Sequence, residues 1–222
     1  MTDSAIPSLM RVCFGAPCFQ TADVLSAGIG HYLIIMSFDP NHFTNEVASI
    51  LALDGNGERL MPLAGGFCSS AEARKRLQAA DARKLFPGAR APEAALAGLW
   101  LYFSCLDECH NIAQQIGSAE GSFWHGIMHR QEPDAGNAGY WFRRVGQHPI
   151  FTDLHARAAE IVTRFPHSGI HLASEWDAYQ FIDICERARR QTASALEQAA
   201  LEIQRAEWQL LFDYCARPLP QA

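Results

Sequence analysis

PEAALAGLWLYFSCLDECHNIA, residues 92–113, is the stretch that decides the fold. Proline and an acidic residue at its start are typical of a first helical turn. Its large side chains then recur every three or four positions, which is the spacing of one helix face. The pattern predicts a helix from Pro92 onward with an inward face made of Leu96, Leu99, Trp100, Phe103, Leu106, His110 and Ala113.

The rest of the chain after this stretch also has helical spacing. Ser174-Glu-Trp-Asp177 has the arrangement of a capping box, with Asp in place of the usual Glu, and predicts a helix start. Further helices are predicted for residues 123–131, 137–145, 150–164, 174–190 and 195–214. The expected fold class is therefore mainly α, a helical bundle or array over residues 72–222.

The first 71 residues differ, because they are rich in glycine and proline. An apolar run at 32–38 and a hairpin pattern at 48–61 predict a small mixed or β-hairpin element packed on the helical body. The hairpin pattern consists of an apolar run at 48–53, the turn Asp54-Gly-Asn-Gly57 and a second short run at 58–61. A helix over residues 42–53 is the alternative. Residues 72–90 alternate basic and acidic side chains and predict a solvated helix that ends near Pro87-Gly88.

Composition excludes several classes of protein. The net charge of −6 argues against a general nucleic-acid binder. No apolar run reaches the roughly 18 residues of a membrane span, and the N-terminus lacks the pattern of a signal peptide. Seven cysteines without regular spacing predict free thiols. We therefore expect a cytoplasmic protein without nucleic-acid or membrane partners, and a homo-oligomer stays open.

Residues 104–149 concentrate the side chains that carry chemistry. His125 and His129 are four residues apart and share a helix face, with Glu132 three residues further on. Asp107 and His110 share a face in the same way. Bringing the two faces together predicts a divalent metal site for zinc, iron or manganese, with these histidines and Asp107 as ligands. Glu132 is expected to act as a ligand or general base, and His129 as the acid–base group if no metal is bound.

The same segment also predicts a pocket for a small polar or anionic molecule. Trp124, Tyr140 and Trp141 offer stacking surfaces. Arginine pairs with carboxylates and phosphates through its planar fork. The polar groups expected to orient the ligand are Arg130, Asp134, Asn137, Arg143 and Arg144.

Glu207 falls on the apolar face of the last predicted helix. A carboxylate among apolar neighbours is costly unless it is paired. Its partner is expected to be an arginine, a histidine or a metal in residues 104–149. This places Glu207 either in a buried ion pair or in the ligand site.

Two functions of different classes follow. In the first, the protein is a metal-dependent, hydrolase-type enzyme that acts on a small polar or anionic molecule. In the second, it is a non-enzymatic ligand-binding, interaction or structural protein, and the histidines, arginines and carboxylates form a buried polar network.

Three strings resemble an uncharacterised family found in bacteria, fungi and plants. They are FWHGIMHRQEPD at 123–134, NAGYWFRRVGQHP at 137–149 and EWQLLFDYC at 207–215. The resemblance spans roughly residues 95–215 and implies no activity for any residue. The family has arginine where this chain has Gln131, so the resemblance does not require a basic pair at that place.

Overall fold

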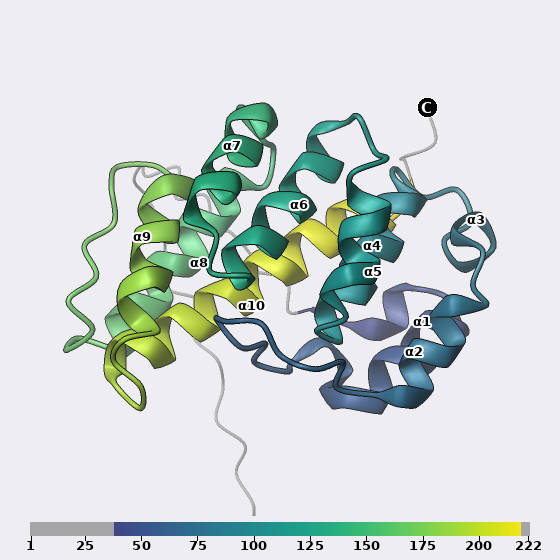
Figure 1. Ribbon diagram of the computed structural model, residues 1–222, viewed down its shortest axis with the longest axis horizontal. Helices are drawn as coiled ribbons and strands as arrows, with labels where there is room; N and C mark the ends of the chain where they lie inside the picture. Colours follow the sequence, from purple (N-terminus) through teal and green to yellow (C-terminus); the bar gives the residue numbers. More distant parts are fainter. Residues whose placement is uncertain (1–37, 219–222) are drawn as a thin grey trace, which may run out of the picture. The chain divides into compact units, whose positions relative to one another are not determined.

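The longest helix, α10 (Ala195–Ala216), joins two groups of helices in the computed structural model (Figure 1). The structure describes residues 38–218. α10 contacts α4 (Pro92–Tyr102), α8 (Phe151–Arg164) and α9 (Ala178–Ala188). The other helices are η1 (Pro40–His42), α1 (Asn45–Leu51), η2 (Ala52–Gly57), α2 (Ala71–Gln78), α3 (Ala82–Leu85), α5 (Leu106–Ala113), α6 (Ala119–Gln131) and α7 (Ala135–Val145).

The predicted fold class, mainly α, is confirmed, since no β-strand occurs between residues 38 and 218. α10 contributes to both hydrophobic clusters of the core. Its first half packs against α8 and α9 through small and branched side chains. Its second half contributes Trp208, Leu211 and Phe212 to the cluster that also contains residues of α4 and α6.

Side-chain caps set where several helices begin. Ser118, Asp134 and Ser194 each accept a hydrogen bond from the backbone N–H three residues ahead, at the starts of α6, α7 and α10. The capping box predicted at Ser174 is wrong. Asp177 caps α9 instead and accepts from two backbone N–H groups, because one carboxylate can satisfy both donors.

The hairpin predicted around residues 48–61 is wrong, and a helical segment takes its place. Thr44 caps α1, and the Asp54-Gly-Asn-Gly57 sequence forms the irregular end of η2, with positive φ at three positions. The Tyr102 hydroxyl accepts from the backbone N–H groups of Gly57 and Arg59, at 3.0 and 3.2 Å. This tertiary contact fixes the turn against α4. The strand predicted at 32–38 lies outside the described residues, apart from Phe38.

The helix predicted through residues 92–113 is two helices, α4 and α5. The helix is interrupted at Ser104, which has φ of 56°. Arg59 donates hydrogen bonds to the Tyr102 carbonyl and, at 3.1 Å, to Ser104 Oγ, so a side chain from outside the helix holds the break. Residues 72–90 are also divided, into α2 and α3. Residues 38–71 belong to the same compact unit as the rest of the described chain.

The expectation that all cysteines are free thiols is wrong. Cys68 and Cys105 form a disulfide bond that ties the loop before α2 to the start of α5. The other cysteines between residues 38 and 218 are buried thiols, and burial raises the pKa of each: Cys109, Cys185 and Cys215. Across the described helices, none is both long and apolar enough to span a lipid bilayer.

Candidate metal centre

Three histidines from two antiparallel helices meet at one place. α5 contributes His110, and α6 contributes His125 and His129 one turn apart. One ring nitrogen from each lies within 4.8 Å of the others. The His110 ring meets His125 edge-on with ring centroids 4.6 Å apart, and His125 and His129 stack at 4.8 Å. The three histidines thus meet as the sequence predicts, because His125 and His129 share a face of α6 and α6 pairs with α5.

His125 is the buried member of the cluster, with 2% of its surface exposed, whereas His110 and His129 are half-buried. Neither His125 ring nitrogen has a hydrogen-bond partner among the described residues. Burial, followed by the neighbouring His129 and His110, lowers the pKa of His125 to about 4. His125 is therefore neutral at physiological pH, the form in which an imidazole binds a metal.

An aromatic side chain of α7 packs against His125. The Trp141 ring stacks on the His125 ring with centroids 3.8 Å apart and 15° between the planes. The Arg144 guanidinium lies 5.3 Å from the centroid of the same indole. Trp141 therefore fixes the orientation of His125 by packing, a role that the sequence interpretation did not assign to it.

Glu132 lies at the C-terminal end of α6, beside His129. Its Oε2 is 3.0 Å from His129 Nδ1. Asp134 also lies near His129, and the hydrogen bonds from Asn137 are the first cause that lowers the pKa of this carboxyl. Glu132 is thus a partner of a histidine in the cluster, whereas Asp134 and Asn137 cap α7 and pair with each other at 2.7 Å.

Arg130 and Glu207 form a buried ion pair between α6 and α10, with 1% and 0% of their side chains exposed. Arg130 Nη1 donates to Glu207 Oε1 at 3.1 Å, and Nη2 donates to Oε2. The expectation that Glu207 has a charged partner in residues 104–149 is confirmed. Arg130 and Glu207 bind each other and neither side chain reaches the surface, which favours the buried ion pair over a ligand-binding role for these two residues.

Sequence reasoning missed the residues that surround this ion pair. The Phe181 ring packs under the Arg130 guanidinium at 4.5 Å, and Gln204 Oε1 accepts from Arg130 Nη2 at 3.5 Å. Arg189 donates to the backbone carbonyl of Arg130 at 3.0 Å. These residues lie 51 to 74 positions from Arg130 in the sequence, so no local spacing signals them.

Two residues that the sequence predicts to be in the site, Asp107 and Trp124, lie outside the histidine cluster. Asp107 is exposed on α5 and is not part of the three-histidine group. Trp124 is fully buried in the core against Gly98 of α4, so its ring is not a surface for a ligand. Tyr140, Arg143 and Arg144 are exposed on α7, and of these Arg144 reaches the Trp141 ring.

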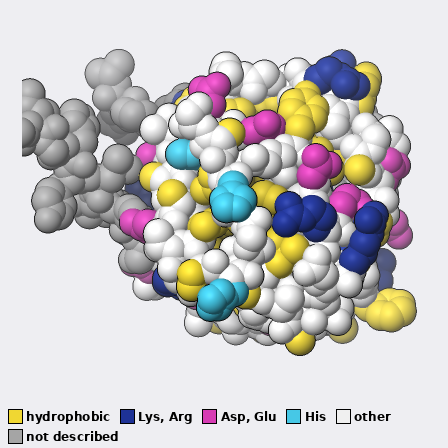
Figure 2. All heavy atoms as spheres, turned by 90° about the vertical axis from the view of Figure 1, so that its left-hand side faces the viewer, with side chains coloured by type: hydrophobic (Ala, Val, Ile, Leu, Met, Phe, Trp, Pro, Cys, Tyr) yellow, Lys and Arg dark blue, Asp and Glu magenta, His cyan; other side chains and the backbone are white. Residues whose placement is uncertain are grey.

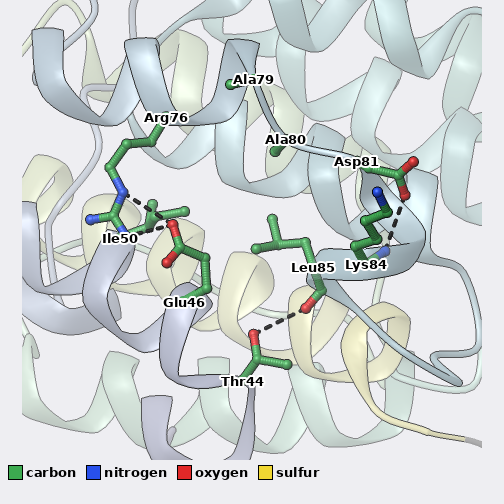
Figure 3. A pocket seen from close by; sticks show the side chains of 9 residues that line it. All are labelled: Thr44, Glu46, Ile50, Arg76, Ala79, Ala80, Asp81, Lys84 and Leu85. Carbon is green, nitrogen blue, oxygen red and sulfur yellow. Dashed lines mark hydrogen bonds and ion pairs between the residues drawn. The ribbon is translucent and has the colours of Figure 1, made fainter.

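A separate surface pocket of about 410 Å³ lies between α1, α2 and α3 (Figure 3). Arg76 spans one side and pairs with Glu46 at 2.6 Å, while Thr44 donates to the Leu85 carbonyl at 3.0 Å. Figure 3 shows the Arg76–Glu46 pair beside Ile50 and the Thr44 hydrogen bond beside the Leu85 side chain. The pocket shares no lining residue with the histidine cluster.

The surface carries charges of both signs. On the face drawn in Figure 2, basic side chains lie beside acidic ones rather than in a broad patch of one charge. Pairs such as Arg205 with Glu58, 3.2 Å apart, join segments distant in sequence. Exposed pairs of this kind contribute little to stability, so the charged surface is best described as mixed.

Comparison of the chain with family models, with curated proteins and with solved structures found no match in any of the three. The family resemblance of the three strings at 123–134, 137–149 and 207–215 stays a prediction. The geometry of the histidine cluster is what supports a function.

Proposed function

We propose that His110, His125 and His129 bind a divalent transition-metal ion and that the protein is a metal-dependent hydrolase for a small polar or anionic molecule. The observation that supports this most is the convergence of three imidazole nitrogens within 4.8 Å. Three histidines with an open fourth position are a ligand set used by catalytic zinc sites.

The ring nitrogens of His125 give a second reason. A buried polar atom without a hydrogen-bond partner is costly, and both nitrogens of His125 are in that state among the described residues. A bound metal would use one of them. Metal–nitrogen bonds of about 2.0–2.1 Å require ligand nitrogens closer than the observed 4.8 Å limit, so small rotations of the imidazoles accompany binding.

Glu132 acts on the proposed site through His129. An ionised carboxylate only accepts hydrogen bonds, so Nδ1 of His129 carries the proton and Nε2 is left to bind the metal. We therefore assign Glu132 a positioning role. His129 becomes a ligand rather than the acid–base group.

A divalent metal held by these three imidazoles would lower the pKa of a bound water to about 7 and would so supply a nucleophile for the hydrolysis of an ester or amide bond. The half-buried His110 and His129 leave the cluster within reach of solvent. Iron and manganese are alternatives to zinc, since imidazole ligands accept all three.

The test is hydrolysis of a panel of carboxylic and phosphoric ester and amide substrates by protein loaded with zinc, iron or manganese. His129→Ala is the inactive variant, and His171→Ala, an exposed histidine outside the cluster, is the matched control. Metal-dependent turnover that His129→Ala abolishes and His171→Ala retains supports the proposal.

If metal binds but no loaded form hydrolyses any substrate, the hydrolase assignment is wrong. If no metal binds and the histidine variants only lose stability, the cluster is a structural polar network, the second function considered from the sequence. A cytoplasmic location, expected from the sequence, stays a separate proposal beside the Cys68–Cys105 disulfide, and cell fractionation tests it.

A further inference from the structure

A short loop with two fixed ends lies beside the two helices that carry the histidine cluster. At its start, Arg189 donates to the Leu63 carbonyl at 3.1 Å, and the same guanidinium nitrogen holds the Arg130 carbonyl of α6. At its end, the Ser69 N–H donates to the Phe103 carbonyl at 2.8 Å, and Cys68 is bonded to Cys105. Residues 64–67 lie between these anchors, and we call them the 64–67 loop.

The 64–67 loop lies beside the start of α5 and the end of α6. A Cβ atom added to Gly65 would lie 3.5 Å from the Gln131 carbonyl and 3.5 Å from a methyl group of Leu106. Gln131 follows His129 by two residues on α6. Leu106 precedes His110 by four residues on α5, and so lies one turn away on the same face. The loop is thus next to both helices that supply the proposed ligands.

Phe67 is the large hydrophobic residue that this loop exposes to solvent. Its surface is 97% exposed, the largest exposed fraction among the large hydrophobic residues of the described chain. It directly follows Gly65 and Gly66, which have no Cβ and leave the backbone wide conformational freedom. An aromatic ring on a glycine hinge beside a site can move onto a bound molecule and exclude water from it.

We propose that Phe67 covers the apolar part of a substrate held at the three-histidine site. This inference rests on the proposed function and narrows the substrate class. The substrate would carry a polar, metal-binding group that is hydrolysed and an apolar group that lies under the Phe67 ring. The anchors at Leu63 and Cys68 limit the movement to the four residues between them.

The test uses two metal-binding probes that differ only in their apolar tail, acetohydroxamate and hexanohydroxamate. Their dissociation constants for the zinc-loaded protein are measured by calorimetry. We expect the native protein to bind hexanohydroxamate about tenfold or more tightly than acetohydroxamate, because the longer tail is buried. Phe67→Ala should reduce this preference to about threefold or less and leave acetohydroxamate binding unchanged.

Leu53→Ala is the matched control, because Leu53 is an exposed apolar residue on η2, at 39%, and should keep the native preference. Gly66→Ala is sterically allowed, since the nearest atom to the added Cβ is 3.7 Å away, and should weaken hexanohydroxamate alone by restricting the hinge.

Equal affinities of the native protein for the two probes, or an unchanged preference in Phe67→Ala, would overturn the inference while zinc binding stands. Failure to bind zinc or either hydroxamate would overturn the proposed function, and the inference with it.

Discussion

His129 Nδ1 lies 3.0 Å from Glu132 Oε2, three residues further along at the end of α6. Glu132 is 40% exposed and His129 is 12% exposed, so the contact lies at the edge of the cluster rather than inside it. A carboxylate in this position selects one tautomer of the imidazole and holds the ring in place.

Glu132→Gln should therefore weaken metal binding without abolishing it. The amide keeps the shape but loses the charge, and changes of this kind at a ligand's partner cost about 10–100-fold in metal affinity. Competition with a chromophoric chelator measures the dissociation constant for zinc. Asp134→Asn is the matched control, and an equal loss in both variants would contradict the role given to Glu132.

The Arg130–Glu207 pair should be essential to stability rather than to ligand binding. Arg130→Met leaves a buried carboxylate without a partner and should lower the free energy of unfolding by about 3–5 kcal/mol. The double variant Arg130→Met/Glu207→Leu removes both charges and should be more stable than the single variant. Urea unfolding is measured for the native protein, the two single variants Arg130→Met and Glu207→Leu, and the double variant. If the loss of unfolding free energy in the double variant equals the sum of the losses in the two single variants, the two charges do not depend on each other.

The contact between α4 and α6 should tolerate no side chain at Gly98. An added Cβ would lie 2.7 Å from Cζ2 of Trp124, and the Gly98 carbonyl accepts from Trp208 Nε1 at 2.8 Å. Gly98→Ala should lower the free energy of unfolding by about 1–3 kcal/mol through overpacking. Gly117→Ala, with no atom within 4 Å of the added Cβ, should leave stability near the native value.

The free energy of unfolding should fall in mild acid, because His148 is buried in its neutral form. Its ring packs against Phe123 and Tyr214, and this burial lowers its pKa; Glu120 opposes the shift and Arg90 adds to it. The native state keeps His148 neutral while the unfolded chain takes up a proton near its ordinary pKa of about 6.5. The contribution of His148 to stability is thus complete above that pH and is lost as the pH falls below it.

His148→Gln should accordingly reduce the dependence of unfolding free energy on pH between about 6.5 and 5. Urea unfolding at a series of pH values measures it, with His171→Gln as an exposed control. A slope equal to that of the native protein would show that His148 does not titrate on unfolding.

Much of the helical body is predictable because its signals are local. The spacing of apolar residues located α6, α7, α8 and α10 within a few residues, and the four-residue spacing of His125 and His129 placed both on one face. The burial of Glu207 followed from its position on an apolar helix face. These features depend on periodicity, which the sequence carries directly.

The failures came from contacts between distant residues. Arg59 holds the break at Ser104, and the Tyr102 hydroxyl holds the turn at Gly57; neither contact leaves a local pattern. Trp124 and Trp141 are equally aromatic in sequence, yet one is in the core and the other stacks on His125. The difference is set by which helix packs on each face of α6.

Metal content shows directly whether His110, His125 and His129 form a metal site. Protein prepared without a His tag is loaded with zinc, iron or manganese, desalted and analysed for each element. We expect about one ion per chain, lost in His125→Ala/His129→Ala and kept in His171→Ala. A native protein that retains no more of any metal than the double variant would show that the three histidines do not form a metal site.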